Sequence, residues 1–323
     1  MQTFLETYKN KQIQMNKNKI IVLGNGYIGK KAYKYFLENL ENIYDVVHLS
    51  NYPYTAPEKL KETLFSNLIS EFRGSQTKWI INCVGYTGKP NVDACEENKQ
   101  ICWDLNVTFP TILAQFSEQH DIKIINISSG CIYDGPEDVH YTEEDEPNFG
   151  LLNPISSWYS KTKHAAELCL KNFSNVYTLR IRMPVCNDFN SQKNYLSKIL
   201  KYNNILDGVN SKTVIEDLLL VINKIINIQD LPSGVYNCVN PKPLSTAQVC
   251  EILDKHGLWN PNWKFINYNE LKQHIVANRS NCILSTDKLK VYGLDMPQER
   301  DSLMRILSEK ETYHTIERSA HLA

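Results

Sequence analysis

The 323-residue sequence lacks several features that would assign it to a special class of protein. No apolar run approaches the roughly 18 residues that a membrane span needs. The formal net charge is −1, so no overall electrostatic field draws the chain to nucleic acid or to acidic membranes. Internal repeats and low-complexity linkers are absent. We therefore expect neither a nucleic-acid partner nor a membrane association.

The nine cysteines follow no ligand or disulfide pattern. They are odd in number and scattered, without a Cys-x-x-Cys pair or the Cys/His spacing of zinc sites. We interpret them as reduced thiols of a cytoplasmic protein, mostly small buried apolar residues, and expect no metal. The first eighteen residues are polar and rich in Lys and Asn, without the apolar stretch of a secretory signal, and predict a flexible extension.

Short β-branched runs alternate with helical patterns along the first half of the chain. Lys19–Leu23 and Lys123–Ile127 are typical of buried strands, whereas Tyr27–Leu40 has the pattern of a helix. This alternation predicts a doubly wound parallel α/β sheet. Beyond Met183 the regularity changes, which indicates a smaller mixed domain; the length itself suggests about two domains.

A glycine motif, Gly24-x-Gly26-x-x-Gly29, stands where the first predicted strand meets the first predicted helix. The pattern alone is weak, but this strand–helix context is the one that dinucleotide binding requires. Glycines permit a tight turn and bring pyrophosphate close to the helix N-terminus, whose amides favour anions. Around His48–Asn51, about twenty residues on, no carboxylate is present to bind the ribose of NAD. This favours NADPH, with NADH kept as an alternative and Lys30 as one candidate cation.

These patterns predict an α/β protein: a doubly wound parallel Rossmann sheet and a smaller mixed α/β C-terminal substrate domain. The predicted boundaries are a flexible extension at 1–18, an NAD(P)-binding Rossmann domain at 19–185, a mainly substrate-binding domain at 186–310 and a tail at 311–323.

Tyr159 and Lys163 are four residues apart in a helical pattern and face the same way. Tyr-x-x-x-Lys is common by chance, but here Ser129 precedes the tyrosine by thirty residues, at the end of a predicted strand. An ammonium beside a phenol lowers the tyrosine pKa towards neutrality. We expect Ser129 to hold a substrate carbonyl, Tyr159 to protonate it, and Lys163 to bind ribose and tune the tyrosine. Cys131 needs a second explanation.

In this order the motifs resemble the extended short-chain dehydrogenase/reductase superfamily. From about residue 19 to 289 the sequence is similar, more closely, to the plant nucleotide-rhamnose synthase epimerase/reductases and the related dTDP-4-dehydrorhamnose reductases. That resemblance implies conversion of a UDP- or dTDP-4-keto-6-deoxyglucose to the L-rhamnose nucleotide, by 3,5-epimerisation and 4-reduction with NADPH. The nucleotide stays open. The matching segments include Gly85–Glu96, Ser129–Ile132, Glu143–Phe149, Tyr159–Lys163, Leu179–Pro184, Lys193–Tyr202 and Arg279–Asn281.

The resemblance assigns a role to Cys131. Protons at C3 and C5 of a 4-keto sugar are acidic, because the enolate places charge on the oxygen that Ser129 and Tyr159 would hold. Inversion needs a base on one face and an acid on the other, and Cys131 and Lys198 match the pair that this family uses. Which of the two is the base is left open.

The resemblance also implies binding residues. Arg279 is expected to bridge the nucleotide diphosphate through its guanidinium fork, with a surface salt bridge as the alternative. Arg182 is interpreted as structural, and Asn106 as either a structural or cofactor-supporting polar group or an exposed polar residue. The expected cofactor-binding residues are Gly24, Gly26, Tyr27, Ile28, Gly29, Ser50, Asn82, Val84, Gly85, Asn106, Tyr159, Lys163 and Met183, and the expected substrate-binding residues are Thr87, Gly88, Lys89, Asn91, Ser129, Cys131 and Arg279.

Two other functions stay open on the sequence alone. One is a reductase-only enzyme of the dTDP-4-dehydrorhamnose reductase type, which depends on a separate epimerase. The other is a non-catalytic, reductase-like regulatory subunit. These residues contain no dehydratase domain, so a 4,6-dehydratase is expected upstream in the pathway. The oligomeric state is also open, a homodimer included.

Overall fold

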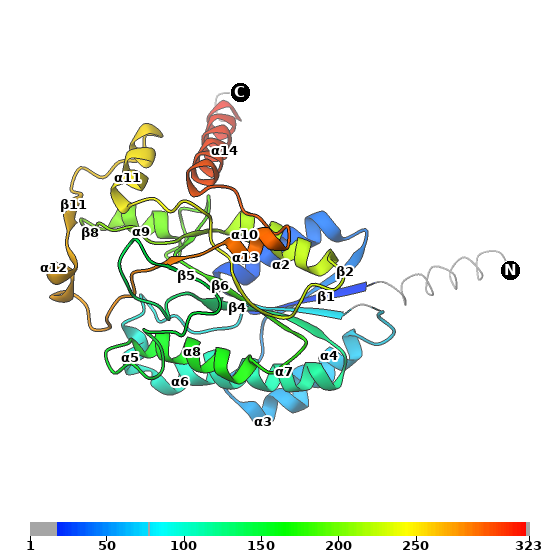
Figure 1. Cartoon of the computed structure of the whole chain (residues 1–323). Coiled ribbons are helices and arrows are strands. Elements are labelled where there is room, and N and C mark those ends of the chain that lie inside the picture. Colours follow the sequence, from blue (N-terminus) through cyan, green and yellow to red (C-terminus); the bar gives the residue numbers. More distant parts are fainter. Residues whose placement is uncertain (1–17, 77, 321–323) are drawn as a thin grey trace.

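The computed structural model describes residues 18–76 and 78–320, so the extension expected at 1–18 lies outside the described residues except for Asn18. A six-stranded sheet forms its centre, in the order β10-β6-β4-β3-β1-β2 (Figure 1). All of its paired strands are parallel, which confirms the predicted doubly wound α/β architecture. The strands are β1 (Asn18–Leu23), β2 (Tyr44–Leu49), β3 (Lys78–Asn82), β4 (Lys123–Ser129), β6 (Val176–Ile181) and β10 (Gly234–Asn237).

Alternate side chains of the sheet strands other than β10 supply two separate cores. In β1, Ile20 and Val22 join one core, and Ile21 and Leu23 join the other, because successive residues of a strand point to opposite faces. Helices cover both faces of the sheet (Figure 1). On one side lie α2 (Tyr27–Leu40) and α10 (Ile215–Asn227), and on the other α3 (Pro57–Leu60), α4 (Ser66–Glu71), α5 (Ala94–Glu97), α6 (Lys99–Trp103), α7 (Phe109–Gln119) and α8 (Trp158–Leu170).

Two π-helical turns interrupt the helices of the second side, η1 (Lys61–Phe65) and η2 (Asp104–Thr108). The sequence predicts a break near Phe109 and Pro110, and the structure has one there. Pro110 lies in the first turn of α7 and has no N–H to donate into the preceding turn, so the α-helical ladder is interrupted just before it.

The sixth strand comes from a segment that the sequence places in the smaller domain. Helix α10 buries Leu218, Ile222 and Ile225 in the same core as β1 and β6. Strand β10 then pairs with β6, with Tyr236 opposite Leu179. Residues 186–310 therefore do not form one continuous domain. The wide apolar stripe of α10 requires a sheet face to cover it, so the chain returns to the sheet before it completes the smaller unit.

The smaller unit has its own core, which includes Leu196, Ile199, Val249, Leu253 and Ile306. Its last helix continues past position 310, where the sequence places the start of the tail. Its elements are α9 (Tyr195–Lys201), β8 (Asn204–Leu206), α11 (Thr246–Lys255), β11 (Lys264–Ile266), α12 (Tyr268–Lys272) and α14 (Glu299–Ala320); short pairs join β5 (His140–Tyr141) to β12 (Ile283–Leu284) and β7 (Pro184–Val185) to β9 (Thr213–Val214), and α13 (Asp287–Val291) follows β12.

Within the described ranges, no helix combines the length and the apolar character that crossing a bilayer demands. The same residues contain no cluster of three or more His, Cys, Asp or Glu side chains arranged to hold a metal ion.

Candidate active site

The expected site residues gather where neighbouring strands end. Because β1, β3, β4 and β6 are parallel, the segments that follow them lie along one edge of the sheet.

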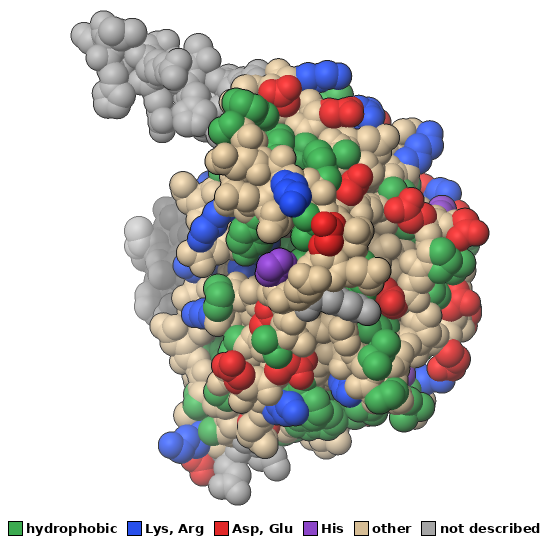
Figure 2. Space-filling model, turned by 90° about the vertical axis from the view of Figure 1, so that its left-hand side faces the viewer, with side chains coloured by type: hydrophobic (Ala, Val, Ile, Leu, Met, Phe, Trp, Pro, Cys, Tyr) green, Lys and Arg blue, Asp and Glu red, His purple; other side chains and the backbone are tan. Residues whose placement is uncertain are grey.

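Figure 2 faces the side of the molecule on which β8, β11 and α12 lie in Figure 1. On that face Lys, Arg, Asp and Glu side chains are interspersed with hydrophobic ones. Positive and negative side chains are thus mixed on the face that this view shows, and neither sign forms a large patch among the coloured side chains.

The glycine motif forms the turn between β1 and α2. Gly24 has φ 98°, and a Cβ there would lie 3.0 Å from backbone atoms of Cys83 and Val84. A Cβ at Gly29 would meet the carbonyl oxygen of Gly24 at 2.1 Å, whereas a Cβ at Gly26 would meet nothing within 4 Å. Gly26 is the N-cap of α2, and no side chain caps it. The turn is thus packed against protein atoms at Gly24 and Gly29 and open at Gly26, at the N-terminus of α2. A pyrophosphate group would fit at this open position.

The segment after β2 presents neutral groups. His48 Nε2 hydrogen-bonds to the carbonyl oxygen of Gly24 at 2.9 Å, and its ring stacks on Tyr33 with a centroid distance of 4.9 Å. Gly24 N donates to the carbonyl oxygen of Leu49 at 3.3 Å. Ser50 follows and is partly exposed. A ribose phosphate lying beside this segment would meet no carboxylate from residues 48–51.

Asn106 organises the loop after β3. Its buried carboxamide accepts the N–H of Tyr86 at 2.8 Å and donates to the carbonyl oxygen of Tyr86 and to Thr162 Oγ1, both at 3.0 Å. A Cβ at Gly85 would lie 3.2 Å from Asn106 Oδ1 and 3.6 Å from Lys163 Nζ. The exposed alternative for Asn106 is therefore wrong: the side chain holds the loop against Lys163.

The side chain of Asn82 is engaged within the protein. It donates to Asn126 Oδ1 at 2.8 Å and accepts the N–H of Val84 at 3.1 Å, which fixes the turn at the end of β3.

Met183, after β6, has φ 34° and precedes Pro184. A left-handed backbone before proline is strained, and such strain is concentrated at functional sites.

Ser129, at the end of β4, lies near Tyr159 and Lys163 of α8. The Ser129 side chain is close enough to the phenol of Tyr159 to affect the pKa of that phenol. Lys163 Nζ lies 3.4 Å from the carbonyl oxygen of Ile127 and 5.8 Å from the centroid of the Tyr159 ring. The predicted lowering of the Tyr159 pKa is wrong: burial raises that pKa, the neighbouring Cys131 adds to the rise, and the Ser129 hydroxyl lowers it by less. Burial also lowers the pKa of Lys163.

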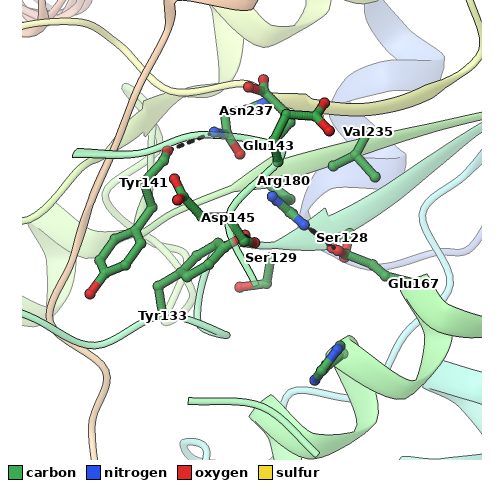
Figure 3. Close-up of polar contacts among 12 residues, drawn as sticks. Ser128, Ser129, Tyr133, Tyr141, Glu143, Asp145, Glu167, Arg180, Val235 and Asn237 are labelled. Atoms are coloured by element: carbon green, nitrogen blue, oxygen red, sulfur yellow. Dashed lines mark hydrogen bonds and ion pairs between the residues drawn. The ribbon is translucent and has the colours of Figure 1, made fainter. Parts of the chain in front are cut away.

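A buried ion pair supports this edge of the sheet (Figure 3). Ser128 Oγ donates to Glu167 Oε1 at 2.9 Å, and Arg180 Nη2 lies 2.7 Å from Glu167 Oε2. The Arg180 guanidinium also stacks on the ring of Tyr133 at 5.2 Å. These contacts join β4, β6 and α8, so the strand that carries Ser129 and the helix that carries the tyrosine and lysine are fixed together.

Cys131 contacts an arginine that the sequence analysis interprets as structural. Arg182 Nη1 donates to Cys131 Sγ at 3.1 Å. The backbone N–H of Cys131 donates to Ser129 Oγ at 3.2 Å. Ile181 pairs with Ser129 in the sheet, so the residue that follows β6 reaches the turn that follows β4. The sequence reasoning missed this neighbour of the thiol; an arginine directly after a buried core strand is the signal that points to it.

Lys198 lies on α9, in the smaller unit, and is partly buried. Burial lowers its pKa, the like charge of Arg279 acts in the same direction, and Cys131 opposes both. The structure therefore brings the two residues expected to catalyse epimerisation into electrostatic range, one from each part of the chain.

A second lysine holds the loop expected to bind substrate. Lys193 Nζ donates to Thr87 Oγ1 at 2.9 Å and to the carbonyl oxygen of Gly88 at 2.5 Å. Gly88 has φ 72°, and a Cβ there would lie 1.9 Å from the carbonyl oxygen of Asn91, so only glycine fits. Burial lowers the pKa of Lys193, and the positive charges of Lys198 and Lys89 contribute. Sequence reasoning did not single out Lys193.

Arg279 forms a two-pronged ion pair with Asp93. Its Nη1 and Nη2 donate to the two carboxylate oxygens at 2.8 and 3.0 Å, and the N–H of Ala277 donates to the same carboxylate at 2.9 Å. Both terminal nitrogens of the guanidinium thus bind Asp93. In this structure Arg279 therefore forms the salt bridge that was the alternative to diphosphate binding. The pair joins the loop after β3 to the smaller unit.

The family model of the RmlD substrate-binding domain matches residues 18–312. The chain belongs to the RmlD family. A trifunctional UDP-glucose 4,6-dehydratase/UDP-4-keto-6-deoxy-D-glucose 3,5-epimerase/UDP-4-keto-L-rhamnose-reductase of Arabidopsis thaliana is 34% identical over 252 residues, 76% of this chain and 37% of that protein. A bifunctional dTDP-4-dehydrorhamnose 3,5-epimerase/dTDP-4-dehydrorhamnose reductase of the same plant is 32% identical over 249 residues, 75% of this chain and 80% of the relative. The chain thus spans little more than a third of the trifunctional relatives.

Solved structures share the fold of this RmlD-family chain. The L780 UDP-rhamnose synthase from Acanthamoeba polyphaga mimivirus aligns with a TM-score of 0.77 and 24% identity, over 90% of this chain and 99% of that one. The dTDP-4-dehydrorhamnose reductase from Bacillus anthracis, solved in complex with NADP, aligns with a TM-score of 0.73 and 20% identity, over 91% and 98%. The resemblance inferred from the motifs is therefore confirmed.

Proposed function

We propose that this chain epimerises C3 and C5 of a UDP- or dTDP-linked 4-keto-6-deoxyglucose and then reduces C4 with NADPH, giving the L-rhamnose nucleotide. One observation carries the proposal: the Ser129 hydroxyl accepts the backbone N–H of Cys131 at 3.2 Å and interacts with the phenol of Tyr159. One carbonyl-binding centre thus has a proton donor and a thiol beside it. The activities named for the plant relatives support the same reaction.

The turn of Gly24, Gly26 and Gly29 would hold the cofactor pyrophosphate, and Lys163 would hold its ribose hydroxyls. The uncharged residues after β2, Ser50 among them, accommodate a 2′-phosphate, and the NADP bound to the Bacillus relative favours the same cofactor. When bound, NADPH supplies the hydride for C4.

Ser129 and Tyr159 would act on the C4 carbonyl oxygen. Both hydroxyls donate hydrogen bonds to it, which stabilises the negative charge that develops on the oxygen during either reaction. The raised pKa of Tyr159 keeps its phenol protonated near neutral pH. Tyr159 therefore holds the proton that the oxygen takes up when C4 is reduced.

Cys131 and Lys198 would invert C3 and C5. One group removes the proton next to the carbonyl, which leaves an enolate held by Ser129 and Tyr159. The other group returns a proton to the opposite face. The substrate is the kind of ketone that a 4,6-dehydratase produces, and we propose such an enzyme as the upstream partner.

The test supplies pure protein with UDP- or dTDP-4-keto-6-deoxyglucose and NADPH in D₂O, and identifies the product sugar by NMR. We expect an L-rhamnose nucleotide with deuterium at C3 and C5. NADPH oxidation only after a separate epimerase is added would instead indicate a reductase-only enzyme. No turnover under either condition would favour a non-catalytic subunit.

A further inference from the structure

We propose that Tyr27 positions the substrate side of the site: its phenol, through Cys186 and Asn194, fixes the start of α9 relative to the cofactor turn. The inference rests on the proposed function and deepens it, because α9 and the residue before its cap carry Lys198 and Lys193. In these terms Tyr27 is a positioning residue. Its side chain acts through the sulfur of Cys186 and exchanges no proton with the substrate.

Tyr27 lies at the junction between the cofactor turn and the rest of the site. It is the first residue of α2 and directly follows Gly26, where the turn is open. The N–H groups in the first turn of a helix have no partner within the helix, so they are available to the expected pyrophosphate. The phenol points to another partner: it donates a hydrogen bond to Cys186 Sγ at 2.7 Å, across 159 positions of sequence. The main chain and the side chain of one residue therefore serve different partners.

Cys186 lies where the chain leaves the main sheet for the smaller unit. It follows β7 and packs in the core that β1 and β6 share, whereas its neighbour Val185 packs in the core of the smaller unit. The side chain is fully buried, and its sulfur also accepts the N–H of Asp188 at 3.2 Å. Burial raises the pKa of the Cys186 thiol and of the Tyr27 phenol. Both groups are therefore neutral near pH 7, and the phenol keeps the proton that it donates.

Asn194 connects Cys186 to α9. Its side chain is fully buried, and its Nδ2 donates to the carbonyl oxygens of Cys186 and Asp188, both at 2.9 Å. Its Oδ1 accepts the N–H groups of Cys186 and Leu196, both at 3.3 Å, and the second of these bonds caps α9. A carboxamide has two donor hydrogens and an oxygen that accepts twice, and all four are used here. The position of Cys186 thus sets the position of the first turn of α9.

Two lysines depend on where α9 begins. Lys193 directly precedes the cap, and its Nζ donates to Thr87 Oγ1 at 2.9 Å, in the loop expected to bind substrate. Lys198 lies one turn into the helix and interacts electrostatically with Cys131. A displaced helix start would move both ammonium groups relative to the cofactor turn. The bond from Tyr27 therefore bears on how the site holds an anionic substrate.

Tyr27→Phe removes this bond with little other change. The ring stays and packs against the core that contains Cys186. Cys186 keeps the bonds that its backbone and sulfur make with Asn194 and Asp188. Loss of one neutral hydrogen bond changes an equilibrium that depends on it about fivefold. We therefore expect a folded variant in which the start of α9 opens more often.

The experiment compares Tyr27→Phe with the wild type in two assays. Hydrogen–deuterium exchange, read by mass spectrometry, reports opening of the peptide that covers α9. Isothermal titration calorimetry reports the affinity for UDP and dTDP in protein saturated with NADP⁺, and separately the affinity for NADP⁺. We expect exchange over α9 to be about fivefold faster and the nucleotide that binds the wild type to bind about fivefold more weakly. The affinity for NADP⁺ should fall by less than the affinity for that nucleotide.

Tyr44→Phe is the matched control. Tyr44, on the edge strand β2, donates to Asn227 Oδ1 at 3.4 Å and lies in the same core, so this variant removes a comparable bond that does not lead to α9. Its exchange over α9 and its affinities should stay as in the wild type.

Substitutions at Cys186 test the bond from its other end. Cys186→Ser keeps an acceptor for the phenol and should behave like the wild type, whereas Cys186→Ala should behave like Tyr27→Phe. The double variant Tyr27→Phe/Cys186→Ala should be no worse than either single variant, because all three lose the same bond.

Unchanged exchange over α9 in Tyr27→Phe would overturn the inference. So would an equal loss of affinity for NADP⁺ and for the nucleotide, since a merely structural defect weakens both alike. If Tyr27→Phe opens α9 while the wild-type protein neither binds UDP or dTDP nor turns over their 4-keto-6-deoxyglucose derivatives, the proposed function fails and the link from Tyr27 to α9 stands.

Discussion

The hydroxyl of Ser129 accepts the backbone N–H of Cys131 at 3.2 Å. This bond fixes the thiol beside the group that would hold the substrate carbonyl. A proton removed next to a carbonyl requires a base close to that carbonyl and a stabilised oxyanion at the same moment. One turn after β4 therefore provides both requirements, and each can be removed separately.

Cys131→Ala should abolish exchange of solvent deuterium into C3 and C5, because the variant has no base or acid on that face. Binding of NADPH should stay intact, since the thiol is not part of the glycine turn. NMR of recovered substrate and a fluorescence titration with NADPH measure the two effects. Cys169→Ala, which removes an exposed thiol, is the control. Unchanged exchange in Cys131→Ala would exclude the epimerase.

Tyr159→Phe should slow NADPH oxidation by about 10²-fold or more, because the carbonyl oxygen loses its proton donor. The ring, and its contact with Lys163, are retained, so NADPH affinity should change little. Stopped-flow absorbance at saturating cofactor and substrate checks the rate. A rate within a few-fold of wild type would mean that another group supplies the proton.

Gly26→Ala and Gly29→Ala should separate cofactor binding from folding. The new Cβ at position 26 meets no protein atom within 4 Å, so the fold should lose only about 1 kcal/mol or less while NADPH binding is blocked. The new Cβ at position 29 would lie 2.1 Å from the carbonyl oxygen of Gly24 and should destabilise the fold itself. Thermal melts and NADPH titrations of both variants test this difference. If Gly26→Ala bound NADPH as the wild type does, the proposed location of the cofactor pyrophosphate at this turn would be wrong.

Asp93→Asn should lose stability at neutral pH but not in acid. Burial tends to raise the pKa of Asp93, but the Arg279 side chain and the N–H of Ala277 lower it by more, so the net shift is downward. A carboxyl with a lowered folded-state pKa stabilises the protein above its unfolded pKa of about 4, and the contribution disappears as pH falls through the folded value. Urea unfolding at pH 7 should therefore show a deficit of about 1 kcal/mol, and that deficit should shrink progressively as the pH is lowered below about 4. A deficit that does not change with pH would exclude the ion pair as its cause.

The buried pair of Lys212 and Glu299 should respond differently to one substitution and to two. Their charged atoms are 3.0 Å apart, and the side chains are 1% and 0% exposed. Glu299→Gln should cost about 3–5 kcal/mol, because it leaves a buried ammonium uncompensated. The double variant Lys212→Met/Glu299→Leu should recover most of that loss in urea unfolding. A double variant no more stable than Glu299→Gln would mean that the ammonium's bonds to the carbonyl oxygens of Asn210 and Leu244 matter more than the pair.

Local patterns predicted the elements that carry the site. Helix α2 has the predicted bounds of Tyr27–Leu40, and β6 the predicted bounds of Val176–Ile181. Both are fixed by apolar periodicity and by neighbouring breakers, which are short-range features. The return of β10 to the main sheet was not predicted, because its pairing with β6 joins residues more than fifty positions apart and leaves no local pattern.

The sequence by itself determined the glycine turn, the Tyr159–Lys163 spacing on one helix and the Ser129–Cys131 spacing at one strand end. Each depends on residues a few positions apart, so backbone geometry alone brings them together. Only the tertiary structure decided which charges surround the thiol: the register of β4 with β6 sets Arg182 against Cys131, and burial raises the pKa of Tyr159. Desolvation and contacts across 51 residues depend on the packed interior, which no local sequence pattern contains.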